Sequence, residues 1–119
     1  IAGGIGITPF RSMLVQSVHD KTNQEAYLFY SNHKPEDTAF LDELTNLSKK
    51  HPWLHFFPIF TDKTGHLKAE TIKKSLKNFK DAFYFISGPP KMVLSTKEML
   101  TSDLEISPDK ILTDNFTGY

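Results

Sequence analysis

The segment from Gly3 to Phe10, Gly-Gly-Ile-Gly-Ile-Thr-Pro-Phe, constrains the fold of this chain more than any other feature. We expect a tight turn from a buried strand into a helix, with Thr8 as the helix cap and Pro9 at the first helical position. Glycine permits unusual backbone angles and close approach of main-chain N–H groups, which we expect at Gly4 and Gly6. The positive end of the helix dipole lies at the same place, so the turn suits a pyrophosphate.

This turn differs from the common dinucleotide-binding fingerprint, which has a third glycine at the position that Pro9 holds here. A glycine turn can also be a tight strand-to-helix connection that binds nothing. If it does hold a phosphate, replacing Gly6 by Val should block the ligand, with little loss of fold if Gly6 lies at a permissive backbone angle.

Short apolar runs alternate with helical patterns along the rest of the chain, which is typical of βαβ units. The sequence therefore predicts an α/β fold in one domain, residues 1–119: a three-layer, Rossmann-like, doubly wound parallel five-stranded sheet with helices on both faces. After a nearly missing first strand, strands are expected at 26–30, 54–60, 82–86 and 110–113. Helices are expected at about 9–20, from 35–37 onward, at about 68–76 and at about 90–100. Pro58 cannot donate to a ladder, so the strand at 54–60 should be an edge strand.

The composition argues against several classes of protein. Basic and acidic residues balance at 14 each, so no basic stripe indicates a nucleic-acid partner. The absence of cysteine excludes disulfides and thiolate catalysis, and fits a cytoplasmic location. The five histidines show no metal-ligand spacing, so no metal is expected. No apolar run reaches membrane-spanning length.

A second motif, Ser87-Gly88-Pro89-Pro90-Lys91-Met92, follows the apolar run at 82–86. Ligands of open α/β sheets bind beyond the carboxyl ends of the strands, so this motif and the glycine turn should border one crevice. There Gly88 would let the backbone approach a planar ligand, and Ser87 would hydrogen-bond its edge. The alternative is a simple strand-end turn in which proline begins a helix.

Together these motifs resemble the nicotinamide-binding domain of the ferredoxin–NADP reductase family of flavoenzymes. That family has a phosphate turn of the form Gly-Gly-x-Gly-x-Thr/Ala-Pro-hydrophobic, and a Cys-Gly-Pro-Pro or Gly-Gly-Pro-Pro strand end with a Met soon after. The matching segments here are Gly3 to Ser12, Tyr30 to His33, Gly65 to Leu67, Ser87 to Met92 and the final Phe116 to Tyr119. Many members have cysteine where this chain has Ser87, which puts the hydride geometry in doubt.

The resemblance implies NAD(P)H binding across the crevice and an N-terminal β-barrel of the same polypeptide, absent here, that holds FAD or FMN. Hydride would pass from nicotinamide to flavin, and electrons then to an acceptor such as an iron–sulfur protein, a flavodoxin or a haem protein. The isolated domain is expected to be inactive. Ser87 takes the catalytic position beside the nicotinamide, and Phe116 and Tyr119 would face the flavin. The residues implied to bind the nucleotide are Gly3, Gly4, Ile5, Gly6, Thr8, Pro9, Ser31, Asn32, His33, Thr61, Asp62, Gly88, Pro89, Pro90 and Met92.

The choice between NADH and NADPH depends on charge near the adenosine ribose. In NADPH-using members Ser and Arg tend to follow the third strand, where this chain has Thr61 and Asp62. A carboxylate accepts from a free 2′-hydroxyl and repels a 2′-phosphate, which favours NADH. The nearby His33, Lys34 and Lys63 could reverse this preference. Two other classes of function stay open, a non-catalytic nucleotide sensor and a protein-interaction module, and nucleotide titration would separate them.

Overall fold

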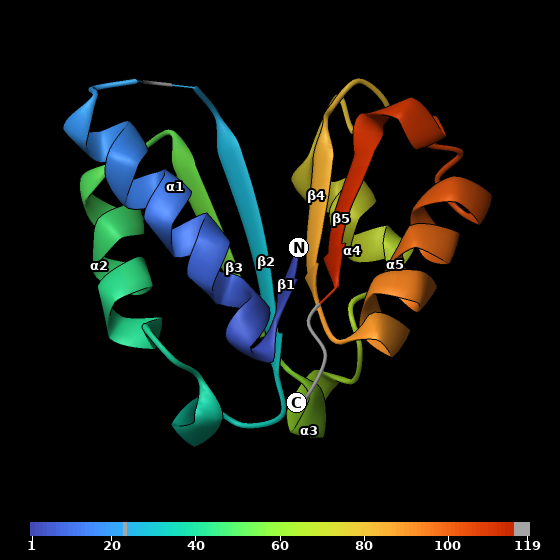
Figure 1. The fold of residues 1–119 in the computed structure, drawn as a ribbon, viewed down its shortest axis with the longest axis horizontal. Coiled ribbons are helices and arrows are strands. Elements are labelled where there is room, and N and C mark those ends of the chain that lie inside the picture. The colour runs from blue at the N-terminus through green and yellow to red at the C-terminus, as the bar shows by residue number, and fades with distance from the viewer. Residues whose placement is uncertain (23, 116–119) are drawn as a thin grey trace.

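Five parallel strands form one sheet that separates two layers of helices (Figure 1). The computed structural model describes residues 1–22 and 24–115. Within these ranges the strand order is β3-β2-β1-β4-β5. The strands are β1 (Ala2–Gly3), β2 (Ala26–Asn32), β3 (Leu54–Phe60), β4 (Tyr84–Gly88) and β5 (Ile111–Asn115).

Helices α1 and α2 cover one face of the sheet, and α4 and α5 cover the other (Figure 1). The predicted three-layer, doubly wound α/β fold is therefore confirmed. The α-helices are α1 (Ile7–His19), α2 (Leu41–Lys50), α3 (Thr61–Thr64), α4 (Ala69–Ser75) and α5 (Pro90–Ser102). Short 3-10 segments are η1 (Gly4–Gly6), η2 (Pro35–Asp37) and η3 (Pro108–Lys110).

The sheet carries an apolar core on each face because successive side chains of a strand point to opposite sides. On β2, Leu28 and Tyr30 pack in the cluster with Leu14 of α1 and Leu44 of α2. Phe29 points the other way, into the cluster of α4 and α5. Burial on both faces explains why β2 is apolar along its length.

The glycine turn differs from the expectation in its details. Helix α1 begins at Ile7, so Thr8 is not its cap and Pro9 is its third residue. Gly6 takes the cap position, with no side-chain hydrogen bond and an ordinary helical φ of −60°. The unusual angle expected at Gly4 is confirmed by its φ of +56°, whereas the one expected at Gly6 is wrong. The physical reason is that η1 runs directly into α1, so the helical path is already set at Gly6.

Other boundaries shift by a few residues. Strand β2 continues through Ser31 and Asn32, which were expected in a loop, because β3 pairs with it to the end. The helix expected from 35–37 is two elements, η2 and α2, which Phe40 separates with a φ of +61°. The polar turn at 61–65 contains the single-turn helix α3. Strand β4 includes Ser87 and Gly88.

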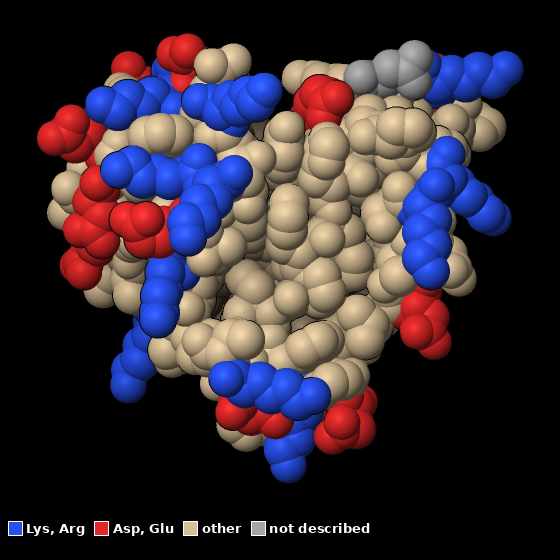
Figure 2. Space-filling model, turned by 180° about the vertical axis from the view of Figure 1, so that it is seen from behind, with Lys and Arg blue, Asp and Glu red and all other residues tan. Residues whose placement is uncertain are grey.

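Strand β3 lies at an edge of the sheet, as Pro58 predicted, since only β2 pairs with it. A broad uncharged surface crosses the side of the molecule seen in Figure 2, and both signs of charge lie around its margin. No helix within the described ranges has the length and apolarity to cross a bilayer.

Candidate functional site

The topology selects one position on the sheet for a ligand. From β1 the chain moves outward through β2 and β3 on one side, and β4 and β5 continue on the other. The carboxyl end of β1 is therefore the topological switch point, where open α/β sheets bind ligands. Ala2 pairs with Tyr30 of β2 and with Ser87 of β4. The glycine turn consequently leaves the sheet between the ends of these two strands.

The outer side of the turn is accessible to solvent. Ile5 is 58% exposed and Thr8 is exposed, whereas Gly3 and Gly6 are buried. Neither η1 nor α1 has a side-chain cap or an acidic residue in its first turn. The positive end of a 13-residue helix thus faces solvent without a counter-charge from its own first turn, an arrangement that attracts anions.

Gly6 is required for packing inside the protein. A Cβ atom built at Gly6 would lie 2.2 Å from the backbone oxygen of Ser87 and 2.8 Å from the backbone nitrogen of Gly88. The amino end of α1 therefore rests directly on the backbone of β4. The condition under which Gly6→Val would leave the fold nearly intact, a permissive backbone angle at Gly6, is not met, and the added atoms would collide with the main chain of β4.

Met92, from the first turn of α5, fills the space that two other glycines leave. A Cβ atom at Gly3 would lie 3.2 Å from the Met92 sulfur, and one at Gly88 would lie 2.8 Å from it. Met92 also packs against the core of α4 and α5. The Met92 side chain thus packs against the ends of both β1 and β4. The predicted contacts of Met92, Pro89 and Pro90 with a nucleotide stay predictions.

Two buried polar atoms flank the switch point without a hydrogen-bond partner among the described residues. They are the amide nitrogen Nδ2 of Asn32 and the hydroxyl oxygen Oγ of Ser87. Ser87 is only 1% exposed. Because an unpaired buried polar atom costs free energy, such atoms call for a partner. Ser87 pairs with Ala2, and Asn32 follows the residue that pairs with Gly3, so the two atoms belong to the strand ends on either side of β1.

The residues predicted near the adenosine ribose come together at the ends of β2 and β3. The backbone N–H of Asp62 donates to the His33 carbonyl oxygen at 3.2 Å, and His33 Nδ1 lies 3.4 Å from Thr61 Oγ1. Asp62 and His33 are both exposed. Lys34 and Lys63 are exposed as well. The structure thus assembles the predicted anionic and cationic groups at one edge of the sheet.

One arrangement near the site has no signal in the sequence. Arg11 of α1 donates to both carboxylate oxygens of Glu43, with its Nη2 2.8 Å from Oε1, and its guanidinium lies 4.9 Å from the centre of the Phe40 ring. The hydrogen bond and the charge of Arg11 lower the pKa of Glu43. These contacts join the amino-terminal parts of α1 and α2 across 32 residues of sequence, a pairing that no local pattern predicts.

Other predicted features lie outside this arrangement. Phe116 and Tyr119 lie outside the described residues. Within residues 1–22 and 24–115 no group of three or more His, Asp or Glu side chains could hold a metal ion. A cavity of about 470 Å³ is lined by residues from the amino ends of β2 and β4, at the opposite end of the sheet from the glycine turn.

A parallel sheet with a glycine turn at its switch point is typical of nucleotide-binding α/β domains. The family model described as "Oxidoreductase NAD-binding domain" matches residues 1–98, and the chain belongs to this family. The resemblance to the NAD(P)-binding domain of ferredoxin–NADP reductase-like flavoenzymes is thereby confirmed.

Known relatives agree with this assignment. The chain is 32% identical to a flavohemoprotein of Rhodopirellula baltica over 101 residues, which cover 75% of this chain and 24% of that protein. It is 25% identical to a probable flavin reductase of Aliivibrio fischeri over 122 residues, which cover 98% of this chain and 52% of the relative. The flavohemoglobin of Malassezia yamatoensis, solved with FAD and haem, has the same fold, with a TM-score of 0.84, 21% identity and coverage of 97% of this chain and 30% of that one. The chain thus spans about half or less of these relatives.

Proposed function

We propose that this chain is the NAD(P)H-binding domain of a flavin-dependent reductase. The observation that carries the proposal is the position of the uncapped glycine turn at the switch point, between two buried polar atoms that have no hydrogen-bond partner among residues 1–22 and 24–115. Family membership independently supports the same assignment.

The residues divide the binding of the dinucleotide between them. The main chain around Gly4, Ile5 and Thr8 would hold the pyrophosphate at the positive end of α1. Ser87 would use its unpartnered hydroxyl to orient the nicotinamide, and Asn32 would offer its free amide N–H to the other half of the molecule. When bound, the reduced nicotinamide supplies a hydride that a flavin can accept. No nucleophile is needed from the protein, whose role is to position the two groups.

The remainder of the reductase is part of the same proposal. A flavin-binding domain of the same polypeptide would hold FAD or FMN, and an iron–sulfur protein, a flavodoxin or a haem protein would accept the electrons. The names of the relatives, flavin reductase and flavohemoprotein, support a flavin partner and a haem acceptor among the possibilities. The cytoplasmic location and the inactivity of the domain alone stay predictions.

We infer NADH as the preferred coenzyme from the exposed carboxylate of Asp62 at the end of β3. A carboxylate there accepts a hydrogen bond from a ribose 2′-hydroxyl and repels a 2′-phosphate. The full-length enzyme should therefore show a higher kcat/KM with NADH than with NADPH. A clear preference for NADPH would remove this role of Asp62.

A charge placed at Thr8 tests the phosphate site without disturbing the core. Thr8 is exposed and lies in the first turn of α1, so Thr8→Glu should stabilise the helix by about 0.3–1 kcal/mol through its dipole. The same charge at about 5 Å from a phosphate would cost about 2–3 kcal/mol at an effective dielectric constant of about 20–40. Affinity for ADP-ribose should fall roughly tenfold or more while Tm rises. Thr8→Gln is the matched neutral control and should change neither quantity much.

Calorimetric titration with ADP-ribose, NADH and NADPH provides the readout. Equal affinity in the Glu and Gln variants would contradict a pyrophosphate at this turn. If the wild-type protein shows no saturable nucleotide binding, a protein-interaction module becomes the supported function in place of the reductase domain. If the wild-type protein binds nucleotide but transfers no hydride when it is joined to its flavin domain, the nucleotide sensor becomes the supported function.

A further inference from the structure

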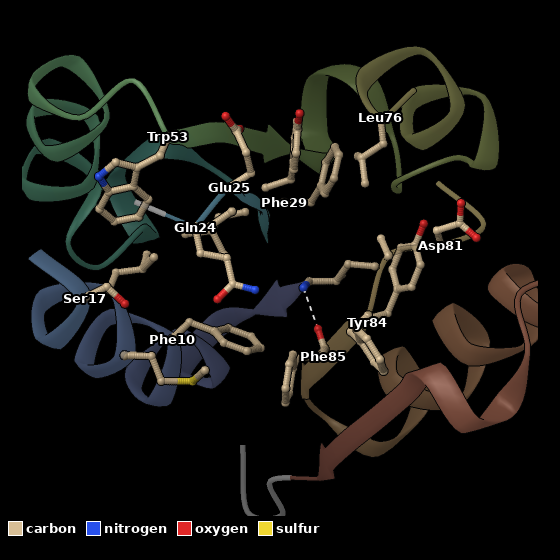
Figure 3. Close-up of a pocket in the computed structure, with 18 residues that line it drawn as sticks. Phe10, Ser17, Gln24, Glu25, Phe29, Trp53, Leu76, Asp81, Tyr84 and Phe85 are labelled. Carbon is tan, nitrogen blue, oxygen red and sulfur yellow. Dashed lines mark hydrogen bonds between the residues drawn. The ribbon is translucent and has the colours of Figure 1, made fainter. Parts of the chain in front are cut away.

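Arg11 is the only lysine or arginine among residues 1–20, and it belongs to the helix that begins at the glycine turn. Helix α1 turns Phe10 and Leu14 toward the sheet, and Figure 3 shows the Phe10 ring at the cavity between β2 and β4. Arg11 leaves the helix on the side of α2, which begins at the same edge of the sheet as α1 (Figure 1). Its positive charge therefore lies at the edge that carries the candidate site.

The side chain of Arg11 is long enough to contact an anion at the first turn of α1. A helical side chain tilts toward the N-terminus of its helix and covers the turn that precedes its own Cα atom. Arg11 follows Ile7, the first residue of α1, by four positions, which is about 6 Å along the axis. An extended arginine side chain spans that distance. The exposed Thr8, three residues before Arg11, is its neighbour on the helix surface.

Two residues at the start of α2 hold the guanidinium of Arg11. Its Nε and Nη2 atoms donate to the Glu43 carboxylate at distances between 2.8 and 3.2 Å, and its central carbon lies 4.9 Å from the centre of the Phe40 ring. Among the residues that the structure describes, no hydrogen bond of Arg11 uses its Nη1 atom. The two N–H groups of Nη1 are therefore available to a second acceptor.

The ion pair between Arg11 and Glu43 is open to solvent, since the two side chains are 38% and 41% exposed. An exposed pair contributes little to stability, so its partners can separate at small cost. A pyrophosphate carries two negative charges, and its oxygens match the planar fork of a guanidinium as a carboxylate does. Because Arg11 lowers the pKa of Glu43, the carboxylate is charged at neutral pH and attracts the same guanidinium.

We propose that Arg11 binds the pyrophosphate of the dinucleotide, and that Glu43 competes with the pyrophosphate for its guanidinium. The inference rests on the proposed function, in which the main chain of the glycine turn holds the same pyrophosphate. The buried Ser87 hydroxyl, which has no partner among the described residues, is an independent sign of a ligand beside that turn. The turn offers only partial charges, and Arg11 adds a full positive charge. Glu43 limits the affinity, because each binding event must displace it.

Two single substitutions with opposite effects test this inference. Arg11→Gln should weaken the binding of ADP-ribose roughly tenfold or more, because a charge-assisted contact to the phosphates is lost. Glu43→Gln should strengthen binding about two- to fivefold, which corresponds to the loss of an exposed ion pair. Both variants lose the same ion pair, so neither should unfold at a higher temperature than the wild-type protein. If the pair only links α1 to α2, affinity should change in the same direction in both variants.

Asp42→Asn is the matched control for the charge of α2. Asp42 is exposed, lies in the same first turn as Glu43 and makes no ion pair among the described residues. Its substitution removes one negative charge without releasing Arg11, so affinity for ADP-ribose should change less than twofold. A gain as large as that of Glu43→Gln would show that only the net charge of α2 matters, and would overturn the competition.

The double variant shows whether Glu43 acts through Arg11. In the Arg11→Gln protein, Glu43→Gln should no longer strengthen binding, and a gain of the same size in both backgrounds would refute the competition. Unchanged affinity in Arg11→Gln would overturn the role of Arg11 itself, even though the wild-type protein binds ADP-ribose. Calorimetric titration of the purified proteins measures all of these affinities. If the wild-type protein shows no saturable binding, the proposed function fails, and this inference fails with it.

Discussion

Replacing Gly6 by Ala should destabilise the protein far more than a surface glycine substitution does. The new Cβ would stand 2.2 Å from the Ser87 oxygen, whereas ordinary contacts begin at 3.4 Å. The start of α1 must therefore retreat from β4 by about 1.2 Å, in a place where overpacking typically costs about 1–3 kcal/mol. Because the obstacle is backbone and not a flexible side chain, we expect the upper end, about 3 kcal/mol.

Gly65→Ala is the matched control. Gly65 has a φ of +75°, and a Cβ there would meet nothing within 4 Å. Its ψ of −168° places it in a region of backbone angles nearly restricted to glycine, so the substitution should cost about 1–3 kcal/mol from backbone strain alone. Urea unfolding followed by circular dichroism measures both free energies of unfolding. If Gly6→Ala loses no more stability than Gly65→Ala, the close packing of α1 on β4 is refuted.

Three further predictions concern the site and the core. Ser87→Ala removes a buried hydroxyl that has no partner among the described residues, so the free energy of unfolding should stay equal or rise by about 1 kcal/mol. Hydride transfer to the flavin should slow more than coenzyme affinity falls. A loss of 2 kcal/mol or more in chemical unfolding would contradict this prediction. Burial raises the pKa of the Tyr84 hydroxyl to about 12. The buried neutral hydroxyl therefore makes its full contribution to the free energy of unfolding below about pH 10. The protein should lose about 2–3 kcal/mol of stability between about pH 10 and 12. Tyr84→Phe should remove that alkaline loss but give up about 1 kcal/mol at neutral pH, because the Phe79 carbonyl oxygen loses its donor; unfolding curves from pH 7 to 12 that are parallel for both proteins would argue against it. Asp62→Asn should raise kcat/KM for NADPH relative to NADH in the full-length enzyme, and an unchanged ratio of the two would show that this carboxylate does not face the ribose.

The sequence predicts the architecture well because the architecture depends on local, repeated signals. The apolar run at 54–60 matches β3 residue for residue, and Pro58 predicts its edge position because a proline cannot donate to a ladder. The helix boundaries are less predictable. Thr8 and Pro9 have the residue types of a helix start, yet α1 begins two residues before Pro9, since η1 feeds it directly.

The candidate site was predictable in its position but not in the use of its residues. Parallel strands bring the glycine turn, Asn32 and Ser87 to one edge, which the order of motifs already indicated. The packing role of Gly6 depends on its contact with the backbone of β4, which lies some eighty residues away in the sequence. No local sequence pattern predicts that contact. In the common fingerprint the third glycine, at the position that Pro9 holds here, serves close helix–strand packing, so that pattern does not predict this role for Gly6.

Strand β1 connects the turn to both halves of the sheet, and this has a consequence for cooperativity. In the described ranges Ala2 pairs with both β2 and β4, and Gly3 pairs with β2, so β1 joins the β2–β3 ladder to the β4–β5 ladder, and the next residues form the turn itself. An anion that binds the folded turn, and not the unfolded chain, would therefore stabilise the junction between the two ladders. Dinucleotide binding should accordingly raise the unfolding temperature of the molecule as one unit, rather than merely ordering a surface loop.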